Sequence, residues 1–298
     1  MRFGGRTLVA GALVCILAML GGIGCDGGTT AVGPKSSFTF PLRVGNSWQY
    51  SRMFYSYGCE PDNLMHLVPD TVFATEITTI ESINKLPNLP ETYVLHTVWV
   101  EGSATGEGYS WRNNTQEGLY TYAYQFTMGT VGPPKLVIPE GSHLSFKGRR
   151  FSNVNELLGW ARSIMEIPAS AGKLTEIDSI QYEDPPARDI AYPIEVGQRW
   201  VYRDSANPWA MEKEVVDIER VSTPALTADC LKIRWYWDID DDGQWDSDID
   251  GYDYLAVNGI LKRRFDFFGV VIRNENSDSL GTFNTTDIYE LIDYELKL

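Results

Sequence analysis

The stretch LKIRWYW (residues 231–237) alternates apolar and polar side chains with a period of two residues. One face carries Leu231, Ile233, Trp235 and Trp237, and the other carries Lys232, Arg234 and Tyr236. Successive side chains of a strand point to opposite sides, so this alternation predicts a β-strand with one buried face. TEITTIESI (75–83) and KEVVDIERV (213–221) show the same period, and Gly- and Asn-rich turns separate such runs. We therefore expect a mainly all-β fold of antiparallel strands.

The chain also contains an internal repeat. FPLRVGNSWQY (40–50) and YPIEVGQRWVY (192–202) share Pro, Val, Gly, Trp and Tyr at positions 152 residues apart. A second match aligns 75–83 with 213–221, and a third aligns Trp111 and Gly118-Leu119 with Tyr252 and Gly259-Ile260. Three matches in one order predict two tandem antiparallel β-sheet domains, residues 37–148 and 189–298. In the second opening motif, we expect Gly197 to allow a tight bend and Val196 and Trp200 to pack inward.

Residues 149–188 are expected to be a linker that carries one helix, at about 153–166. Asn153 and Glu156 have the spacing of an N-terminal helix cap, and Pro168 follows the predicted end. Apolar residues recur at helical spacing at Val154, Leu157, Leu158, Ala161, Ile164 and Met165. This face could bind a partner, but we expect it to cover the protein's own sheet. The segment DPPARD (184–189) is typical of a hinge before the second domain.

The first 24 residues have the layout of a signal peptide: Arg2 and Arg6 precede an uncharged run that ends in small residues before Cys25. This segment resembles a bacterial lipoprotein signal, although Gly22 stands where leucine is usual. The resemblance implies that Cys25 is lipidated and that residues 25–36 form a flexible tether. An uncleaved membrane anchor is the alternative. Either arrangement puts the folded part in the cell envelope, outside the cytoplasm, anchored to a membrane on its periplasmic side or at the cell surface.

The opening motif and the later stretch YLAVNGILKRR (254–264) are similar to those of a loosely defined group of bacterial lipoproteins. Members of this group carry a PLxVGxxWxY opening, often in tandem, and a later strand like this one. The resemblance implies an envelope-associated, β-rich protein and brings no established activity with it.

Charge narrows the choice of partner. The chain has 40 acidic residues against 25 Lys and Arg, for a net charge of −15. Such an acidic surface repels phosphate backbones, so we expect no nucleic-acid partner, whereas cations, basic proteins and neutral glycans stay open. Cys59 and Cys230 lie in different halves, and an oxidising compartment would permit a disulfide between them.

The clearest candidate for a metal site in the sequence is the acidic segment DIDDDGQWDSDIDG (238–251). It contains two DxDxDG patterns: Asp238, Asp240 and Asp242 before Gly243, and Asp246, Asp248 and Asp250 before Gly251. Both patterns resemble the calcium loops of EF-hands, dockerins and thrombospondin type-3 repeats, which implies that these six aspartates bind calcium. Acids at alternate positions of a turning loop supply the hard oxygens that calcium prefers. The acid that closes an EF-hand is missing, because Ile249 and Val257 stand at that position.

The repeat provides an internal comparison for this loop. The first copy has eleven residues with two acids between Trp99 and Trp111, whereas the second has fourteen with seven acids between Trp237 and Tyr252. The shared fold therefore does not require the acids. A bound calcium ion, in a structural role, would relieve their mutual repulsion. The alternative is a solvated acidic loop that aids solubility.

No enzyme motif is present. The three histidines His66, His96 and His143 have no zinc-site spacing, and only His143, beside two serines, could join a dispersed triad. Tyr120, Tyr122, Tyr124 and Phe126 alternate, which could present a glycan or peptide surface or simply stabilise a sheet. We expect a non-catalytic, envelope-anchored structural or binding module. The alternatives are a carrier of a hydrophobic ligand or lipid on a curved β-sheet, and a hydrolase with dispersed carboxylates.

Overall fold

The structure, a computed structural model, describes residues 38–67, 71–102, 104–127, 141–153, 156–157, 159–160, 177–204 and 209–297. Most of these residues lie in β-strands, and one short 3-10 helix, η1, spans Asp62–Leu67. The strands of the first half are β1 (Ser47–Glu60), β2 (Val72–Asn84), β3 (Thr92–Glu101), β4 (Ala104–Asn114), β5 (Gly118–Thr127), β6 (His143–Phe146), β7 (Arg149–Phe151) and β8 (Ile177–Ala191). Those of the second half are β9 (Arg199–Arg203), β10 (Ala210–Ser222), β11 (Thr227–Asp238), β12 (Ile249–Ala256), β13 (Gly259–Arg273) and β14 (Ser279–Glu295).

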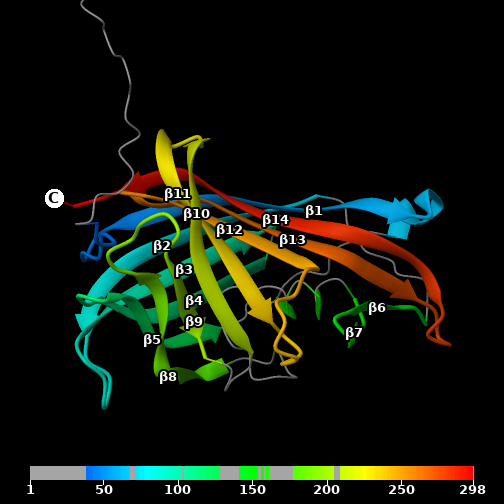
Figure 1. Cartoon of the computed structure of the whole chain (residues 1–298), viewed down its shortest axis with the longest axis horizontal. Coiled ribbons are helices and arrows are strands. Elements are labelled where there is room, and N and C mark those ends of the chain that lie inside the picture. Colours follow the sequence, from blue (N-terminus) through cyan, green and yellow to red (C-terminus); the bar gives the residue numbers. More distant parts are fainter. Residues whose placement is uncertain are drawn as a thin grey trace, which may run out of the picture. The chain divides into compact units, whose positions relative to one another are not determined.

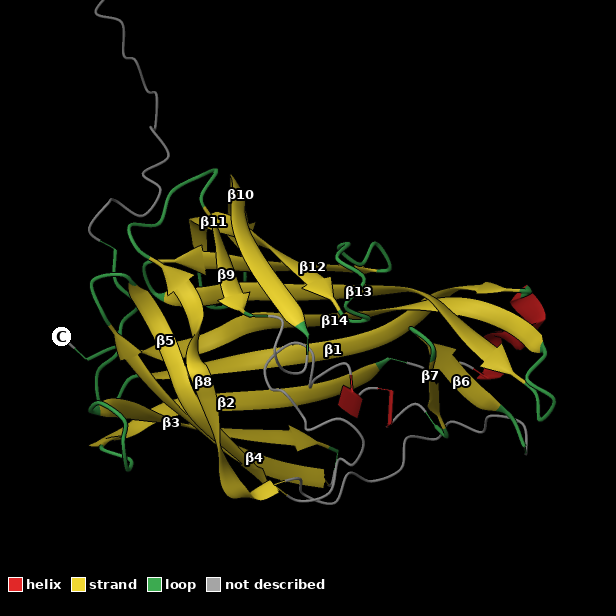
Figure 2. Ribbon diagram, turned by 60° about the horizontal axis from the view of Figure 1, so that its bottom comes forward, coloured by secondary structure: helices red, strands yellow, loops and turns green. Residues whose placement is uncertain are grey.

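The strands form one antiparallel sheet in the order β8-β5-β4-β3-β2-β1-β14-β13-β12-β11-β10-β9. Strands β1 and β14, from the two ends of the chain, pair along their length, with Trp48 opposite Tyr294 (Figure 1). The sheet curls until β8 and β9, at the two ends of the order, lie side by side (Figure 2). Each side chain on the inner face therefore meets others across the interior. The all-β, antiparallel fold class is confirmed.

The two repeat copies are halves of this one sheet. The first contributes β1 to β5, the second contributes β9 to β14, and β8 comes from the segment between them. Strand β1 pairs with β2 on one side and with β14 on the other. In a separate first domain β1 would be an open edge strand, but here that edge bonds to the second copy. The described residues, which lie between 38 and 297, belong to one compact unit. This corrects the expectation of two tandem domains at 37–148 and 189–298: pairing of the open strand edges merges the copies.

The segment expected to be a linker, 149–188, contributes two strands. It contains β7 and most of β8, and DPPARD lies within β8, which pairs irregularly with β5. The expected helix begins as predicted: the Glu156 amide donates to Asn153 Oδ1 at 3.0 Å, and residues 156–157 and 159–160 are helical. Leu157 and Trp160 are buried in the core, so this part of the helix covers the protein's own sheet. Other residues of the predicted span, 154–155, 158 and 161–166, lie outside the described residues.

Corresponding strands of the two copies match more closely in structure than in sequence. The Gly45 amide donates to the Ile80 carbonyl at 2.8 Å, and the Gly197 amide donates to the Val215 carbonyl at 2.7 Å. A β-bulge follows Ile80 and another follows Val215. Ile80 therefore corresponds to Val215, whereas the sequence match places it against Ile218. The pairing of the strands was right but its register was wrong by three residues. Apolar residues recur every three positions in both segments, at Ile77, Ile80 and Ile83 and at Val215, Ile218 and Val221, so the sequences match at either register.

The inner face is filled by large apolar side chains. The alternation of LKIRWYW is confirmed, since all four residues of its predicted buried face are buried and the other three are only partly buried. Gly197 takes a φ of +86°, as its tight bend requires, and Trp200 is buried, but Val196 is 51% exposed, so its inward placement was wrong. Val196 belongs to the turn before β9 and lies beyond the sheet that would cover it.

Cys59 and Cys230 are both buried and free. They belong to separate core clusters, and the disulfide considered from the sequence is not formed.

The signal segment, Cys25 and the tether lie outside the described residues. Within the described part of the chain, no helix is long and apolar enough to cross a membrane.

Candidate functional site

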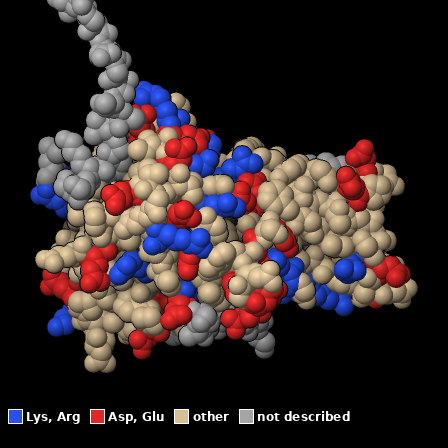
Figure 3. All heavy atoms as spheres, viewed as in Figure 1, with Lys and Arg blue, Asp and Glu red and all other residues tan. Residues whose placement is uncertain are grey.

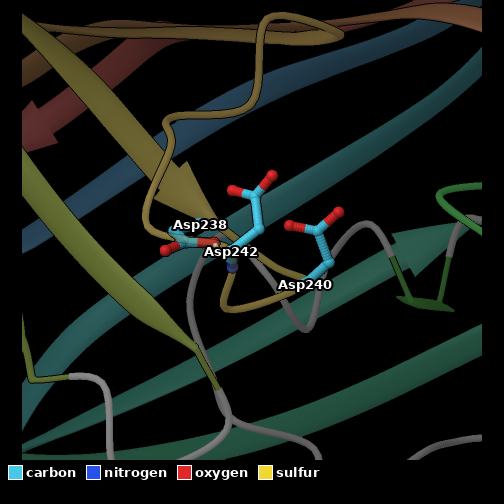
Figure 4. Close-up of side chains that lie close together, drawn as sticks. All are labelled: Asp238, Asp240 and Asp242. Carbon is cyan, nitrogen blue, oxygen red and sulfur yellow. Dashed lines mark hydrogen bonds between the residues drawn. The ribbon is translucent and has the colours of Figure 1, made fainter.

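The first DxDxDG pattern follows the end of β11 and brings its three acids together. Asp238, Asp240 and Asp242 place carboxylate oxygens within 4.8 Å of one another (Figure 4). Asp238 is buried, whereas Asp240 and Asp242 are exposed with their carboxylates on the same side of the loop. One buried anchor and two exposed carboxylates form a donor set to which an ion has access from solvent.

Backbone hydrogen bonds shape this turn. The Asp238 carboxylate accepts from the amide of Asp242 at 3.1 Å and from that of Gly243 at 3.0 Å. Gly243 has a φ of +79°, and Asp241 has a φ of +57°, both in the left-handed region that a sharp reversal needs. Each carboxylate oxygen has two acceptor sites, so these bonds leave Asp238 able to bind a cation. The residues fit a hard divalent ion such as calcium.

The second pattern does not converge. Lys147, in the turn between β6 and β7, forms ion pairs with Asp246 and with Asp248, the latter at 3.0 Å. Burial lowers the pKa of the Lys147 ammonium, but hydrogen bonds and charge attraction from the two aspartates outweigh it and the pKa is raised. Asp250 already belongs to β12, where it lies 3.3 Å from Arg234. The expectation that Asp246, Asp248 and Asp250 gather on one metal ion is corrected, because the Lys147 ammonium occupies the position between Asp246 and Asp248, and Asp250 pairs with Arg234.

The matching hairpin of the first copy has a short turn. Strand β3 ends at Glu101 and β4 begins at Ala104, whereas ten residues, 239–248, separate β11 from β12. The acidic loop is thus an insertion into a hairpin that closes without it. Away from this loop, acidic and basic side chains are interspersed over the face in Figure 3, which shows no large patch of one sign.

A second candidate site lies inside the curl of the sheet. A small pocket, partly open to solvent, is surrounded by strands from β4 round to β13. Its apolar and aromatic lining consists of Phe40, Leu119, Ile190, Tyr202, Ile233, Trp235, Leu255 and Ile260. Its charged lining consists of Arg112, Asp189, Lys213, Asp253 and Arg263. An apolar lining with a few convergent charged groups is typical of small-molecule sites.

The charged residues of the pocket form a connected network. Arg263 Nε donates to Asp253 Oδ1 at 2.6 Å, and Lys213 Nζ lies 3.9 Å from Asp253 Oδ2. Lys213 Nζ also donates to the Asp189 carbonyl at 3.2 Å. The Asp189 carboxylate accepts from Thr121 Oγ1 at 2.6 Å and lies 3.9 Å from Arg112 Nε. These contacts link β4 and β5 of the first copy, and β8, to β10, β12 and β13 of the second.

Lys213 is the most unusual member of the network. Its side chain is buried, with Nζ 3.6 Å from the ring centroid of Trp235 and 4.4 Å from that of Tyr202. Burial lowers the pKa of the Lys213 ammonium to about 8, although Asp253 and Asp189 oppose the shift. A titratable group with a perturbed pKa inside a pocket is a candidate functional residue.

Comparisons with known proteins give no family. No protein-family model and no curated protein matches the chain. Among solved structures, the chain is similar to a crystal structure from Bacteroides fragilis NCTC 9343 of a "putative exported protein with YmcC-like fold". The TM-score is 0.32 at 11% sequence identity, and the match covers 87% of this chain and 99% of the other. A likeness of this degree supports no inference about activity, ligand or location.

Sequence interpretation missed the charged pocket, although its signal was present. Lys213 lies between Met211 and Val215 on the buried face of β10. Likewise, Asp253 shares the buried face of β12 with Leu255. A single charged residue at an apolar position of an alternating strand indicates a buried charge. That neighbouring strands place them around one cavity depends on the register.

The remaining catalytic candidate is His143. It is buried in β6, and Nδ1 has no hydrogen-bond partner among the described residues. Burial lowers the pKa of the imidazole, and Arg150 and Arg273 lower it further. The imidazole therefore lies in the interior and not at the surface. In the alternating aromatic row of β5, Tyr120 and Tyr122 are half-buried and Tyr124 is buried. The side chain of Phe126 lies outside the described residues.

Proposed function

We propose that the chain is a non-catalytic binding protein of the cell envelope, lipid-anchored at Cys25 and braced by one calcium ion. The observation that carries the calcium assignment is the convergence of Asp238, Asp240 and Asp242 in an insertion that the matching hairpin lacks. The resemblance of this segment to known calcium loops supports the same ion. The signal-like first 25 residues and the PLxVGxxWxY repeats support the envelope location.

Calcium would act on the sheet through Asp238. This residue is the last of β11, two positions beyond Tyr236 and directly after the fully buried Trp237. An ion held by Asp238, Asp240 and Asp242 would lower the repulsion between these carboxylates and fix the start of the loop. The loop's far side is held by Lys147, so the ion and the ion pair would together hold the insertion against the β6–β7 turn.

The calcium proposal is tested by thermal unfolding of the purified protein in excess EDTA and in millimolar calcium. Binding to the native state must raise the midpoint in calcium. Asp240→Asn should shrink that rise, because it removes one charge from the converging set. Asp248→Asn is the matched control, since this residue pairs with Lys147 and should leave the rise intact. Equal midpoints in EDTA and calcium would remove the site.

The anchor is tested by membrane fractionation. Cys25→Ser should release the protein from membranes, whereas Cys15→Ser, a cysteine within the uncharged run, should not. Membrane association that survives Cys25→Ser would favour the uncleaved anchor instead.

The charged pocket favours a second candidate function, that of a ligand carrier. The same pocket gives weaker support to a hydrolase. Asp189 and Asp253 line the same pocket, but each carboxylate accepts a short hydrogen bond and lies near a cation. Both carboxylates are therefore already engaged by donors and cations of the protein itself.

A further inference from the structure

The interior pocket has a surplus of positive charge. Arg112, Lys213 and Arg263 face two carboxylates, Asp189 and Asp253, in a chain whose net charge is −15. Lys213 and Asp253 are each 3% exposed, so these charges cannot be balanced by bulk solvent. Buried charges are costly unless they are paired, and here three cations share two carboxylates.

Donor groups in the pocket are also incompletely used. Among the residues that the structure describes, Lys213 Nζ has one acceptor within hydrogen-bond distance, the Asp189 carbonyl at 3.2 Å. Arg112 donates through Nε to Ser110 at 3.2 Å, and no described residue accepts from its terminal Nη atoms. The indole N–H of Trp235, a buried lining residue, has no acceptor in the described part of the chain. Of these three groups, the Trp235 indole and the Lys213 ammonium are buried, and buried donors without enough acceptors are rare in native proteins.

The rest of the wall is apolar. Leu119, Ile190, Ile233, Leu255 and Ile260 line the pocket beside the cations. We propose that this pocket binds a small organic carboxylate, with its anionic head at Arg112 and Lys213 and its apolar tail against these aliphatic side chains. The inference rests on the proposed binding role but is independent of calcium.

A carboxylate suits these donors better than a neutral head group. The planar guanidinium of Arg112 can donate two parallel hydrogen bonds to two carboxylate oxygens, and Lys213 can add a third. The charge of the ligand would complete the pairing that Asp189 and Asp253 leave unfinished. Burial already lowers the pKa of Lys213 to about 8, and a bound anion would raise it again by stabilising the ammonium.

The test is calorimetric titration of the purified, calcium-saturated full chain with hexanoate at pH 7. Hexan-1-ol is the matched neutral ligand, with the same tail and no charge, and inorganic phosphate is an anion without a tail. We expect hexanoate to bind at one site per chain, at least about tenfold more tightly than either comparison ligand, given the usual strength of hydrogen bonds to charged groups.

Two pocket variants and one control locate the site. Arg112→Gln and Lys213→Met should each weaken hexanoate binding by about tenfold or more, because each removes a charged donor. Lys262→Met should leave binding unchanged, since this lysine of β13 pairs with Glu290 and does not line the pocket. Arg112 is only partly buried, so its variant stays informative if Lys213→Met fails to fold.

The proposal is overturned if hexanoate does not bind, if hexan-1-ol or phosphate binds as tightly, or if both pocket variants bind like the wild type. Failure here is distinct from failure of the calcium brace. A missing calcium shift in the melts would leave the hexanoate titration unaffected, and a missing hexanoate signal would leave the calcium shift intact.

Discussion

The ammonium of Lys213 lies over the ring of Trp235, with Nζ 3.6 Å from the ring centroid. The ring face attracts the cation, and Tyr202 contributes a second aromatic face. These contacts do not replace the water that Lys213 loses on burial, as its lowered pKa shows. A lysine held in this way reduces stability, which is typical of residues kept for binding.

Lys213→Met should therefore raise the stability of the ligand-free protein at pH 7. The lowering of the Lys213 pKa from 10.5 to about 8 corresponds to a destabilisation of about 3 kcal/mol. Loss of the hydrogen bond from Nζ to the Asp189 carbonyl would offset about 1 kcal/mol of the gain. We expect urea unfolding to show a net gain of about 1–3 kcal/mol. A clear loss of stability would mean that the ion pairs of Lys213 outweigh its desolvation.

The same residue predicts a pH dependence. The folded-state pKa of Lys213, about 8, is below the unfolded value of 10.5, so the unfolded chain binds more protons between these two pH values. The contribution of Lys213 to stability must then rise as pH increases from 8 towards 10.5. The groups that face it are Arg112, Asp189, Tyr202, Asp253 and Arg263.

The measurement is the difference in unfolding free energy between wild type and Lys213→Met at pH 7 and at pH 9.5. Other groups that titrate in this range largely cancel in the difference. The advantage of the variant should shrink at the higher pH, and an advantage that stays constant would show that Lys213 does not lose its proton in this window.

Arg52 and Asp287 hold the two copies together at the seam between β1 and β14. Both are buried, Arg52 Nε lies 2.8 Å from Asp287 Oδ1, and a second hydrogen bond joins Nη2 to Oδ2. Arg52→Met should destabilise the protein by about 3–5 kcal/mol, because it leaves a buried carboxylate unpaired. The double variant Arg52→Met/Asp287→Leu should recover most of that loss in urea unfolding. Equal losses in the single and double variants would contradict this account.

Gly259 should tolerate no side chain. Its φ is +111°, and an added Cβ would lie 2.8 Å from Nε1 of Trp48, which donates to the Asn258 carbonyl. Gly259→Ala should cost about 2–3 kcal/mol, from backbone strain together with the displaced indole. Gly269→Ala is the control, since Gly269 has a φ of +76° but open space around it. Equal losses of stability in the two variants would exclude the steric contribution.

Lys147 should stabilise the acidic loop even without metal. Lys147→Met leaves the nearly buried Asp246 without its cation and should cost about 1–3 kcal/mol in EDTA. Asp248 is more exposed, so Asp248→Asn should cost less than about 1 kcal/mol. Urea unfolding of both variants measures the two losses of stability. A larger loss in Asp248→Asn than in Lys147→Met would contradict the prediction that the Lys147–Asp246 pair is the more important one.

The sequence by itself determined the local features of this protein. The alternation in LKIRWYW predicted both the strand and its buried face, because strand geometry sets a period of two for any chain. The cap made by Asn153 and Glu156 and the turn made by Asp238 and Gly243 also formed as expected, since each depends on neighbours within a few residues.

Only the tertiary structure decided which distant groups meet. Pairing of β1 with β14 merged the two expected domains, because an open strand edge bonds to any edge of suitable register. Lys147 reached Asp246 across about a hundred residues, and the second aspartate set thereby lost its predicted convergence. Lys213, Asp253 and Arg263 became one site because bulges and cross-strand register, which alternation alone does not specify, turn all three to the inside of the curled sheet.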